Sequence, residues 1–427
     1  MTGPLTAGTL GEVTPPHLRS VAADPPRKAT RIADVDQALV VAAELSAAFA
    51  AAAGARDADR VLPHDQVQAL KDSGLLALSV PVEHGGIAAP AALIAEVFRL
   101  FAHGDPSLAQ IPHSHYTFLE AVRLQGTDAQ QAFFFEKVLE GALFANAQSE
   151  RGPHPIDVDA TTLVRDGNHY LLDGRKFYST GALFADWVVV RASLPEHPGD
   201  TPTSSTPKAL AFVPADIEGL QIVDDWDGMG QRTTASGTVT LDAVRVPVEQ
   251  VLDFTPIFRS PSVYGARAQL FHAALDVGIA TAALAEGVRQ SAKARPHFEA
   301  GVDTAADDPT VVHLAGELTV TVRGAQALLT EAGRAVDAAA ADLDSDSAAA
   351  ASVAVAVAKV AATRASLEAS STLFELGGTR SASGAANLSR YWRDARTHTL
   401  HDATRWKLQH IGRYTLSGTK PPRHGQL

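Results

Sequence analysis

Two histidines and an aspartate stand close together near the end of the chain, in the segment Thr397–Trp406. Read as a helix, this segment places His398, His401 and Asp402 on neighbouring turns of one face, because residues three and four apart are neighbours there. Imidazoles titrate near neutral pH, so such a pair suits proton transfer or hydrogen bonding to a reacting group. The competing interpretation is a surface helix that carries these side chains without chemistry, and the segment alone favours it.

A metal site is the other chemistry that these residues suggest. His398 and His401 offer two imidazoles, but Asp402 is the one obvious third ligand, and no His-Glu-x-x-His pattern is present. The chain has no cysteine, which excludes disulfides, thiolate metal sites and cysteine nucleophiles. We therefore expect no metal.

Composition limits the remaining classes. A chain of 427 residues is expected to form two or three structural units, and its 46% hydrophobic and 20% charged residues are ordinary for a globular protein. A net charge of −12 without a basic block argues against nucleic acid. No apolar run of about 18 residues and no targeting signal at the N-terminus is visible, so we expect a cytoplasmic protein with no membrane span.

The hydrophobic periodicity changes twice along the chain. Apolar spacings of three and four predict helices before about Asn146, with one helix begun by Pro63 and ended near Gly74. Short Val-rich runs with Asp-Gly turns then predict strands and a hairpin. Long Ala-rich helical patterns return from about Tyr264. The expected units are a flexible leader (1–30), a helical domain (31–145), a β domain (146–262), a helical bundle (263–412) and a tail (413–427).

This order of units resembles the acyl-CoA dehydrogenase fold: mainly α with a central β domain, comprising an N-terminal helical domain, a middle β-barrel or sandwich domain and a C-terminal four-helix bundle. Motifs similar to those of the family extend over roughly residues 35 to 412, too long a span for a chance match. They are Val80–Gly86, Gly174–Gly181, Met229–Gly237, Val244–Pro247, Phe374–Thr379 and Arg393–Arg396.

Departures from the dehydrogenases indicate a different branch. The family's catalytic glutamate is replaced by Asp402, which is one methylene shorter and preceded by histidine. The segments His398–Asp402, Arg405–Lys407, Ile411–Tyr414 and Pro421–Gly425 resemble flavin-dependent monooxygenases of this fold. These enzymes use reduced flavin from a separate reductase, and they include dibenzothiophene monooxygenase and the bacterial oxidoreductases of dimethyl-sulfone-type sulfur acquisition.

The resemblance implies a role for individual residues. We expect His401 to hydrogen-bond to or protonate a flavin C4a-hydroperoxide, His398 to orient it or contact substrate, Ser179 to hydrogen-bond to flavin N5, and His115 to complete the pocket. Ordinary structural roles, such as a surface histidine or a packed tryptophan, remain open for several of these positions. The expected cofactor contacts are Asn146, Ser149, Ser179, Trp226, Arg232, Arg295, Gly377 and Gly378.

The implied function is a two-component monooxygenase that transfers one oxygen atom of O2 to a small organosulfur compound, with an aromatic carbon or an amine nitrogen as other targets. FMN is the expected cofactor and FAD the alternative. No Gly-x-Gly-x-x-Gly follows a strand, so electrons should come from a partner NAD(P)H:flavin reductase. A homotetramer is expected. Two rival functions are an acyl-CoA dehydrogenase with Asp402 as base and a non-catalytic flavin-fold binding protein.

Overall fold

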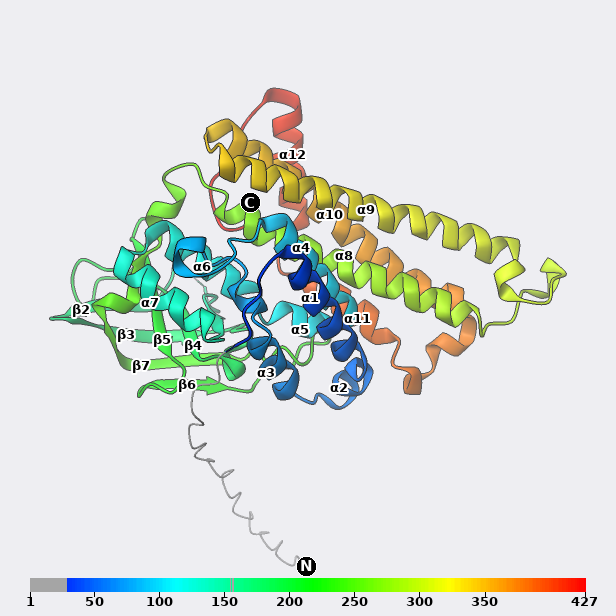
Figure 1. Ribbon diagram of the computed structural model, residues 1–427, viewed down its shortest axis with the longest axis horizontal. Helices are drawn as coiled ribbons and strands as arrows, with labels where there is room; N and C mark the ends of the chain where they lie inside the picture. The colour runs from blue at the N-terminus through cyan, green and yellow to red at the C-terminus, as the bar shows by residue number, and fades with distance from the viewer. Residues whose placement is uncertain (1–28, 154, 156) are drawn as a thin grey trace, which may run out of the picture.

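Three units follow one another along the chain (Figure 1). The structure, a computed structural model, describes residues 29–427 except 154 and 156. The expected leader, residues 1–30, therefore lies almost entirely outside the described residues. Short helices come first, a sheet follows, and long helices complete the fold, as the hydrophobic periodicity predicts.

The N-terminal unit consists of short helices, and α1 and α4 share an apolar cluster with the long C-terminal helices. The Asp34 side chain caps the first helix by accepting a hydrogen bond from the Gln37 N–H. The helix predicted between Pro63 and Gly74 is confirmed, with Pro63 as its N-cap and Gly74 in a left-handed conformation. The helices are α1 (Val35–Ala50), α2 (Ala53–Asp59), α3 (His64–Asp72), α4 (Ala91–Gly104), α5 (Pro106–Gln110), α6 (His113–Gln125) and α7 (Asp128–Leu139).

The β unit is one sheet with the strand order β6-β7-β3-β2-β4-β5-β8, and β1 pairs in parallel with β4. The predicted hairpin is confirmed as the antiparallel pair β2–β3. An apolar cluster joins the sheet to α6 and α7, so the N-terminal helices cover part of it. The strands are β1 (Phe144–Ala147), β2 (Thr162–Asp166), β3 (His169–Lys176), β4 (Trp187–Ser193), β5 (Lys208–Pro214), β6 (Leu220–Val223), β7 (Thr238–Pro247) and β8 (Val251–Asp253).

Long helices form the C-terminal unit, as the spacing of their apolar residues predicts. Alanine lines their contacts, and its small side chain lets the helix axes approach closely. One apolar cluster runs from this bundle into α1 and α4, so both helical units share a core. The expected boundary at residue 412 falls inside the last helix. The helices are α8 (Tyr264–Ser291), α9 (Pro309–Ala341), α10 (Ser345–Gly377), α11 (Ser389–His398) and α12 (Thr404–Ser417).

Two of these helices, α8 and α10, are long and apolar enough to cross a membrane by length and composition. Their most apolar windows are 83% and 61% buried inside the protein. Packing in the shared core therefore accounts for their apolar character.

Candidate active site

The His-x-x-His-Asp segment is not one continuous helix. Helix α11 ends at His398, and the His401 N–H donates to the carbonyl of His398, a three-residue turn in place of the four-residue step of an α-helix. The expectation of a shared helical face is wrong for this reason. His398 and Asp402 are nonetheless buried, while the His401 side chain is 49% exposed.

His398 is held by a buried carboxylate on α8. Its Nδ1 contacts Asp276, and the same carboxylate accepts hydrogen bonds from Lys359 Nζ at 2.6 Å and Thr363 Oγ1 at 3.1 Å. Burial raises the pKa of Asp276, but Lys359 and His398 outweigh burial and lower the pKa to about 2. Asp276 is thus a charged group that only accepts hydrogen bonds.

The charge of Asp276 determines which ring nitrogen carries the proton in His398 and in His272. Because Asp276 can only accept, the His398 Nδ1–H must donate to it. Burial lowers the pKa of His398, and its ring is neutral, so its Nε2 is an acceptor. His398 Nε2 lies 3.1 Å from His272 Nδ1, which therefore carries the donated proton. The Nε2 of His272 is left with a free lone pair.

Two more imidazoles complete what we call the imidazole cluster: His113, His272, His398 and His401. The His113 ring stacks on His272 with centroids 3.7 Å apart, and the His401 ring lies 4.1 Å from His272. His113 Nε2 is 2.9 Å from the carbonyl oxygen of Ala268, and burial lowers the pKa of His113 to about 3. Three neutral, buried rings thus support one exposed ring.

Asp402 lies beside the cluster without a hydrogen bond. Both carboxylate oxygens are buried and lack a partner among the described residues, and His401 Nδ1 is 3.6 Å away, beyond hydrogen-bond range. Burial raises the pKa of Asp402, yet the neighbouring His401 and Lys407 bring it well below its usual range. A buried, charged and unsatisfied carboxylate calls for a ligand or water.

Ser179 lies between β3 and the 3-10 turn formed by Ala182–Phe184. Its side chain is fully buried, its hydroxyl has no partner among the described residues, and its N–H donates to the Gly237 carbonyl at 3.0 Å. The preceding Tyr178 has φ of 56°, a left-handed conformation that a residue with a side chain seldom adopts. An orphaned buried hydroxyl at a strained loop fits a group bound from outside the chain.

Other expected flavin contacts surround this loop. Asn146 on β1 donates from Nδ2 to the Tyr178 carbonyl at 3.2 Å. The Trp226 indole packs edge-on against the Tyr178 ring, with centroids 6.3 Å apart. Ser149 is exposed and pairs with Phe177 through the backbone. Asn146, Tyr178 and Trp226 therefore form one polar and aromatic rim.

The Ser179 loop and the imidazole cluster share supports. The Gln231 N–H donates to Asp394 on α11 at 2.6 Å, and a Cβ at Gly230 would overlap the carbonyl oxygen of Arg393 on that helix. Helix α11 ends in His398. The loop before β7, which carries Gly230 and Gln231 and bonds to Ser179 through Gly237, is therefore attached to the helix that carries part of the cluster. Gly181, two residues after Ser179, packs against Ile111, just before His113.

His115 has no ring nitrogen free for a cofactor. Its side chain is fully buried, its Nε2 is 2.9 Å from the Leu76 carbonyl, and its Nδ1 accepts from the Phe144 N–H at 3.1 Å. The expectation that His115 completes the pocket must be corrected on these contacts. His113, two residues earlier on α6, faces the cluster instead.

The residues expected to hold a flavin phosphate do not gather in one place. Arg232 Nη1 donates to the Asp57 carbonyl at 2.6 Å and so binds the end of α2. Gly377 packs against Gln290 at the C-terminal ends of α10 and α8, and Arg295 is exposed in the following connection. Figure 1 places these ends at the side of the bundle away from the sheet. Gly378 is exposed beside Gly377.

One hollow lies beside Arg232, and another lies at the N-terminal ends of α8 and α10. One, of about 380 Å³, is lined by Trp226 and Arg232, together with Arg60 and three aspartates, Asp224, Asp225 and Asp227. Its size is that of a small ligand pocket, but its acidic lining does not suit a phosphate. The other, of about 90 Å³, is too small for a flavin.

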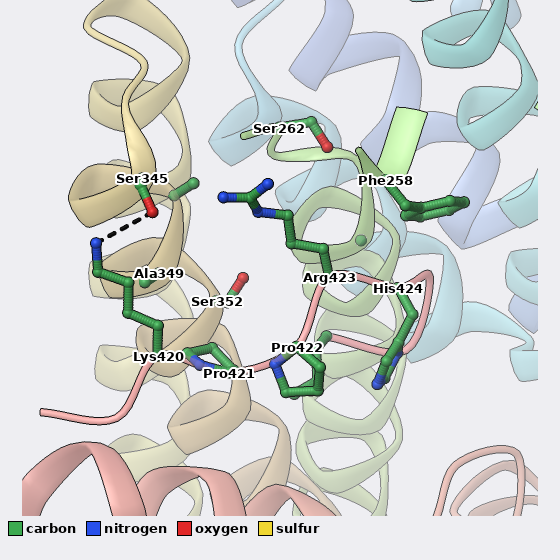
Figure 2. A pocket seen from close by; sticks show the side chains of 13 residues that line it. Phe258, Ser262, Ser345, Ala349, Ser352, Lys420, Pro421, Pro422, Arg423 and His424 are labelled. Atoms are coloured by element: carbon green, nitrogen blue, oxygen red, sulfur yellow. Dashed lines mark hydrogen bonds between the residues drawn. The ribbon is translucent and has the colours of Figure 1, made fainter. Parts of the chain in front are cut away.

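The smaller hollow shows how the last residues of the chain pack against the bundle (Figure 2). Lys420 Nζ donates to Ser345 Oγ at 3.1 Å at its rim. A Cβ at Gly265, near the start of α8, would overlap the Leu427 carbonyl oxygen. Lys407 Nζ donates to the Gln426 carbonyl at 2.9 Å and to Gln269 at 2.6 Å. This segment therefore braces the part of α8 that carries His272.

Comparison with known proteins agrees with this architecture. Models of the acyl-CoA dehydrogenase N-terminal, middle and C-terminal domains match residues 37–142, 144–244 and 270–406. The chain belongs to the acyl-CoA dehydrogenase family. The fold predicted from its motifs is thereby confirmed.

Within this family the chain is similar to monooxygenases. It is 31% identical to dibenzothiophene monooxygenase of Rhodococcus erythropolis, over 82% of this chain and 86% of that protein. It is 31% identical to the probable FMNH2-dependent monooxygenase SfnC of Pseudomonas putida, over 90% and 96%. The crystal structure of FMN-bound TdsC from Paenibacillus sp. A11-2 aligns with a TM-score of 0.85 and 31% identity, over 92% of this chain and all of that one.

Four residues of the site were missed by sequence reasoning: His113, His272, Asp276 and Lys359. Asp276 and Lys359 did carry a signal, because each is an isolated charge in an apolar, Ala-rich helix. Such charges are almost never buried unless they are paired. The two histidines carried no comparable signal.

Proposed function

We propose that this protein is a reduced-flavin-dependent monooxygenase that transfers one oxygen atom of O2 to a small organosulfur compound. The observation that carries the proposal is the imidazole cluster beside Asp402, the residue that the resemblance aligns with the carboxylate base of the dehydrogenases. A desaturase needs a carboxylate with free access to substrate, whereas Asp402 here is buried behind the half-exposed His401.

The flavin chemistry belongs to the cofactor: bound reduced FMN would activate O2 for transfer. The protein's part is to hold groups and protons in place. The orphaned Ser179 hydroxyl and the rim of Asn146, Tyr178 and Trp226 offer polar and aromatic contacts to a ring system. FMN is supported by the FMN-bound relative and by the FMNH2-dependent one.

The fixed tautomers of His398 and His272 support a role for His401 as hydrogen-bond donor or acid. The charge of Asp276 fixes the tautomer of His398, which in turn fixes that of His272. The His272 ring then lies against the His401 ring, with centroids 4.1 Å apart. His401 is the member with solvent access, so it can exchange protons while the buried rings hold its position.

Water exclusion is the second contribution of these residues. Burial of three of the four rings creates an environment in which neutral imidazoles accept and donate without bulk water. Exclusion of water also slows unproductive loss of activated oxygen as H2O2. The organosulfur substrate is supported by the named relatives, and sulfur is a soft nucleophile that suits an electrophilic oxygen.

A second component and a second copy of the chain belong to this proposal. Reduced FMN would come from a separate NAD(P)H:flavin reductase in the cytoplasm. Arg295, Gly377 and Gly378 lie at the end of the bundle away from Ser179, so within one chain they cannot hold the same cofactor as that hydroxyl. A homotetramer, in which a neighbour presents these residues to the flavin, would reconcile the two positions.

The test is turnover with an unrelated flavin reductase, NADH, FMN and a panel of sulfides, sulfones and thiophenes under 18O2. We expect one 18O atom in the product and no product when the reductase is omitted. Bleaching of a bound oxidised flavin by an acyl-CoA, without reductase, would support the dehydrogenase instead. Absence of O2-dependent product with every substrate would support a non-catalytic protein.

A further inference from the structure

The geometry points to a divalent transition-metal site formed by His272, His401 and Asp402, with Zn²⁺ as the best-fitting ion. The three side chains each offer one ligand atom, and these atoms lie within 4.8 Å of one another. They come from α8 and from the turn between α11 and α12. Two imidazoles and one carboxylate form a ligand set that zinc prefers.

The His398–His401 pair that the sequence suggests as ligands is not the pair that the structure offers. His398 has no lone pair to give, because its Nδ1 is bonded to Asp276 and its Nε2 to His272. His272 donates a hydrogen bond from its Nδ1–H to His398 Nε2 and keeps the lone pair on its own Nε2. His272 therefore replaces His398 as the first imidazole ligand.

The second observation is the state of Asp402. Its side chain is 2% exposed, and neither carboxylate oxygen has a hydrogen-bond partner among the described residues. A buried carboxylate without partners is costly, and a metal ion would satisfy it. Lys407, a buried cation that lowers its pKa, donates hydrogen bonds to Gln269 and Gln426 and, among the described residues, none to Asp402.

The spacing fits after a small movement. In a tetrahedral zinc site with bonds of about 2.0–2.1 Å, neighbouring ligand atoms are about 3.4 Å apart. His401 Nδ1 and Asp402 Oδ2 are already 3.6 Å apart. His401 lies on an exposed turn, so its ring can rotate toward His272 to close the remaining distance. Exposure of His401 also gives the ion a way in and leaves a fourth position for water.

Metal binding at these residues has a consequence for activity, and that consequence alone rests on the proposed function. A bound ion would occupy the Nδ1 lone pair of His401. His401 could then neither turn toward the reacting oxygen nor take up the second proton that it needs to act as an imidazolium acid. Zn²⁺ should therefore inhibit oxygenation, and a chelator should restore it.

The test measures binding directly in tag-free, flavin-free protein, by titration with Zn²⁺ and by the visible absorption of Co²⁺. We expect one Zn²⁺ per chain and a Co²⁺ spectrum of four- or five-coordinate geometry. Asp402→Asn and His272→Gln should each weaken Zn²⁺ binding at least tenfold. His297→Gln changes an exposed histidine with a glutamate 3.8 Å away and serves as the matched control.

Binding that is equally weak in all four proteins, or equally reduced by His297→Gln, would overturn the site. Asp402→Asn keeps the size of the side chain, so it remains informative even if His272→Gln does not fold. Zn²⁺ binding without inhibition would uphold the metal site and contradict the role given to His401. Failure of the unaltered protein to bind Zn²⁺, with turnover unaffected by added Zn²⁺, would overturn the metal site and leave the role of His401 standing.

Discussion

His272 Nδ1 lies 3.1 Å from His398 Nε2, which joins α8 to the end of α11 across 126 residues of sequence. The far nitrogen of His398 contacts Asp276, whose charge is kept by Lys359. A line of four side chains thus runs from a buried cation to the ring that supports His401. Each member constrains the next, which makes the arrangement testable residue by residue.

His401→Ala should separate flavin oxidation from product formation. Within the described part of the chain the half-exposed ring makes no hydrogen bond, and its distance of 3.6 Å to Asp402 is beyond that range, so flavin binding should stay unchanged. Product formation should fall by about 10²-fold or more, since a positioned acid contributes that much, and the missing oxygen should appear as H2O2. Comparison of O2 consumed with product formed measures this coupling. His410→Ala, on α12 outside the cluster, is the control and should keep wild-type coupling. Equal coupling in His401→Ala and His410→Ala would show that His401 takes no part in the reaction.

Asp276→Asn should destabilise the protein and uncouple it. Neutralising this carboxylate leaves Lys359 buried and unpaired, which costs about 3–5 kcal/mol in comparable cases, and it frees the tautomer of His398. Urea unfolding gives the free energy. Asp346→Asn, at an exposed pair with Lys420, is the control and should change stability by about 0.5 kcal/mol or less. Similar losses in the two variants would mean that the buried charge has no special role.

Ser179→Ala should weaken flavin binding without weakening the fold. The hydroxyl has no partner within the described part of the chain, so its removal breaks no internal hydrogen bond. A lost bond to flavin corresponds to roughly a two- to tenfold weaker Kd. Fluorescence titration with FMN and thermal unfolding measure the two effects. A lower Tm with unchanged flavin affinity would assign Ser179 a purely structural role.

Asp394 should make stability fall as pH rises. Burial raises the pKa of Asp394 to about 7, despite the hydrogen bond from the Gln231 N–H. Between about pH 4 and pH 7 the unfolded chain releases this proton and the folded protein keeps it, so the free energy of unfolding declines by up to about 4 kcal/mol. Asp394→Asn keeps the acceptor and should remove this component of the pH dependence. Denaturant midpoints of the unaltered protein and of Asp394→Asn, each at pH 5 and pH 8, give the comparison. An equal change of midpoint in the two proteins would refute the role of Asp394.

Local signals allowed the fold to be predicted. Apolar spacing predicted α8, α9 and α10, and the Asp-Gly turns predicted the β2–β3 hairpin, because these patterns depend on residues near one another in sequence. The family motifs then supplied the order of the units. Local pattern failed at Thr399–Ala403, where the chain turns so that His398 points into the bundle and α12 starts a new direction.

The site could be predicted only where a motif marked it. His398, His401 and Ser179 lie in such motifs, whereas His272 lies within an apolar helix. Its role arises from contacts with residues far along the chain, which no local pattern reports. Likewise, nothing in His113-Ser-His115 distinguishes the ring that faces the cluster from the one that binds backbone groups of Leu76 and Phe144.

The most direct test of the cluster's role is stopped-flow mixing of the protein and reduced FMN with oxygenated buffer. We predict a transient absorbance distinct from both reduced and oxidised FMN, which persists in the wild type and decays rapidly with H2O2 release in His401→Ala. Reoxidation of FMN by the wild type at the rate of free FMN, with no such transient, would contradict the account.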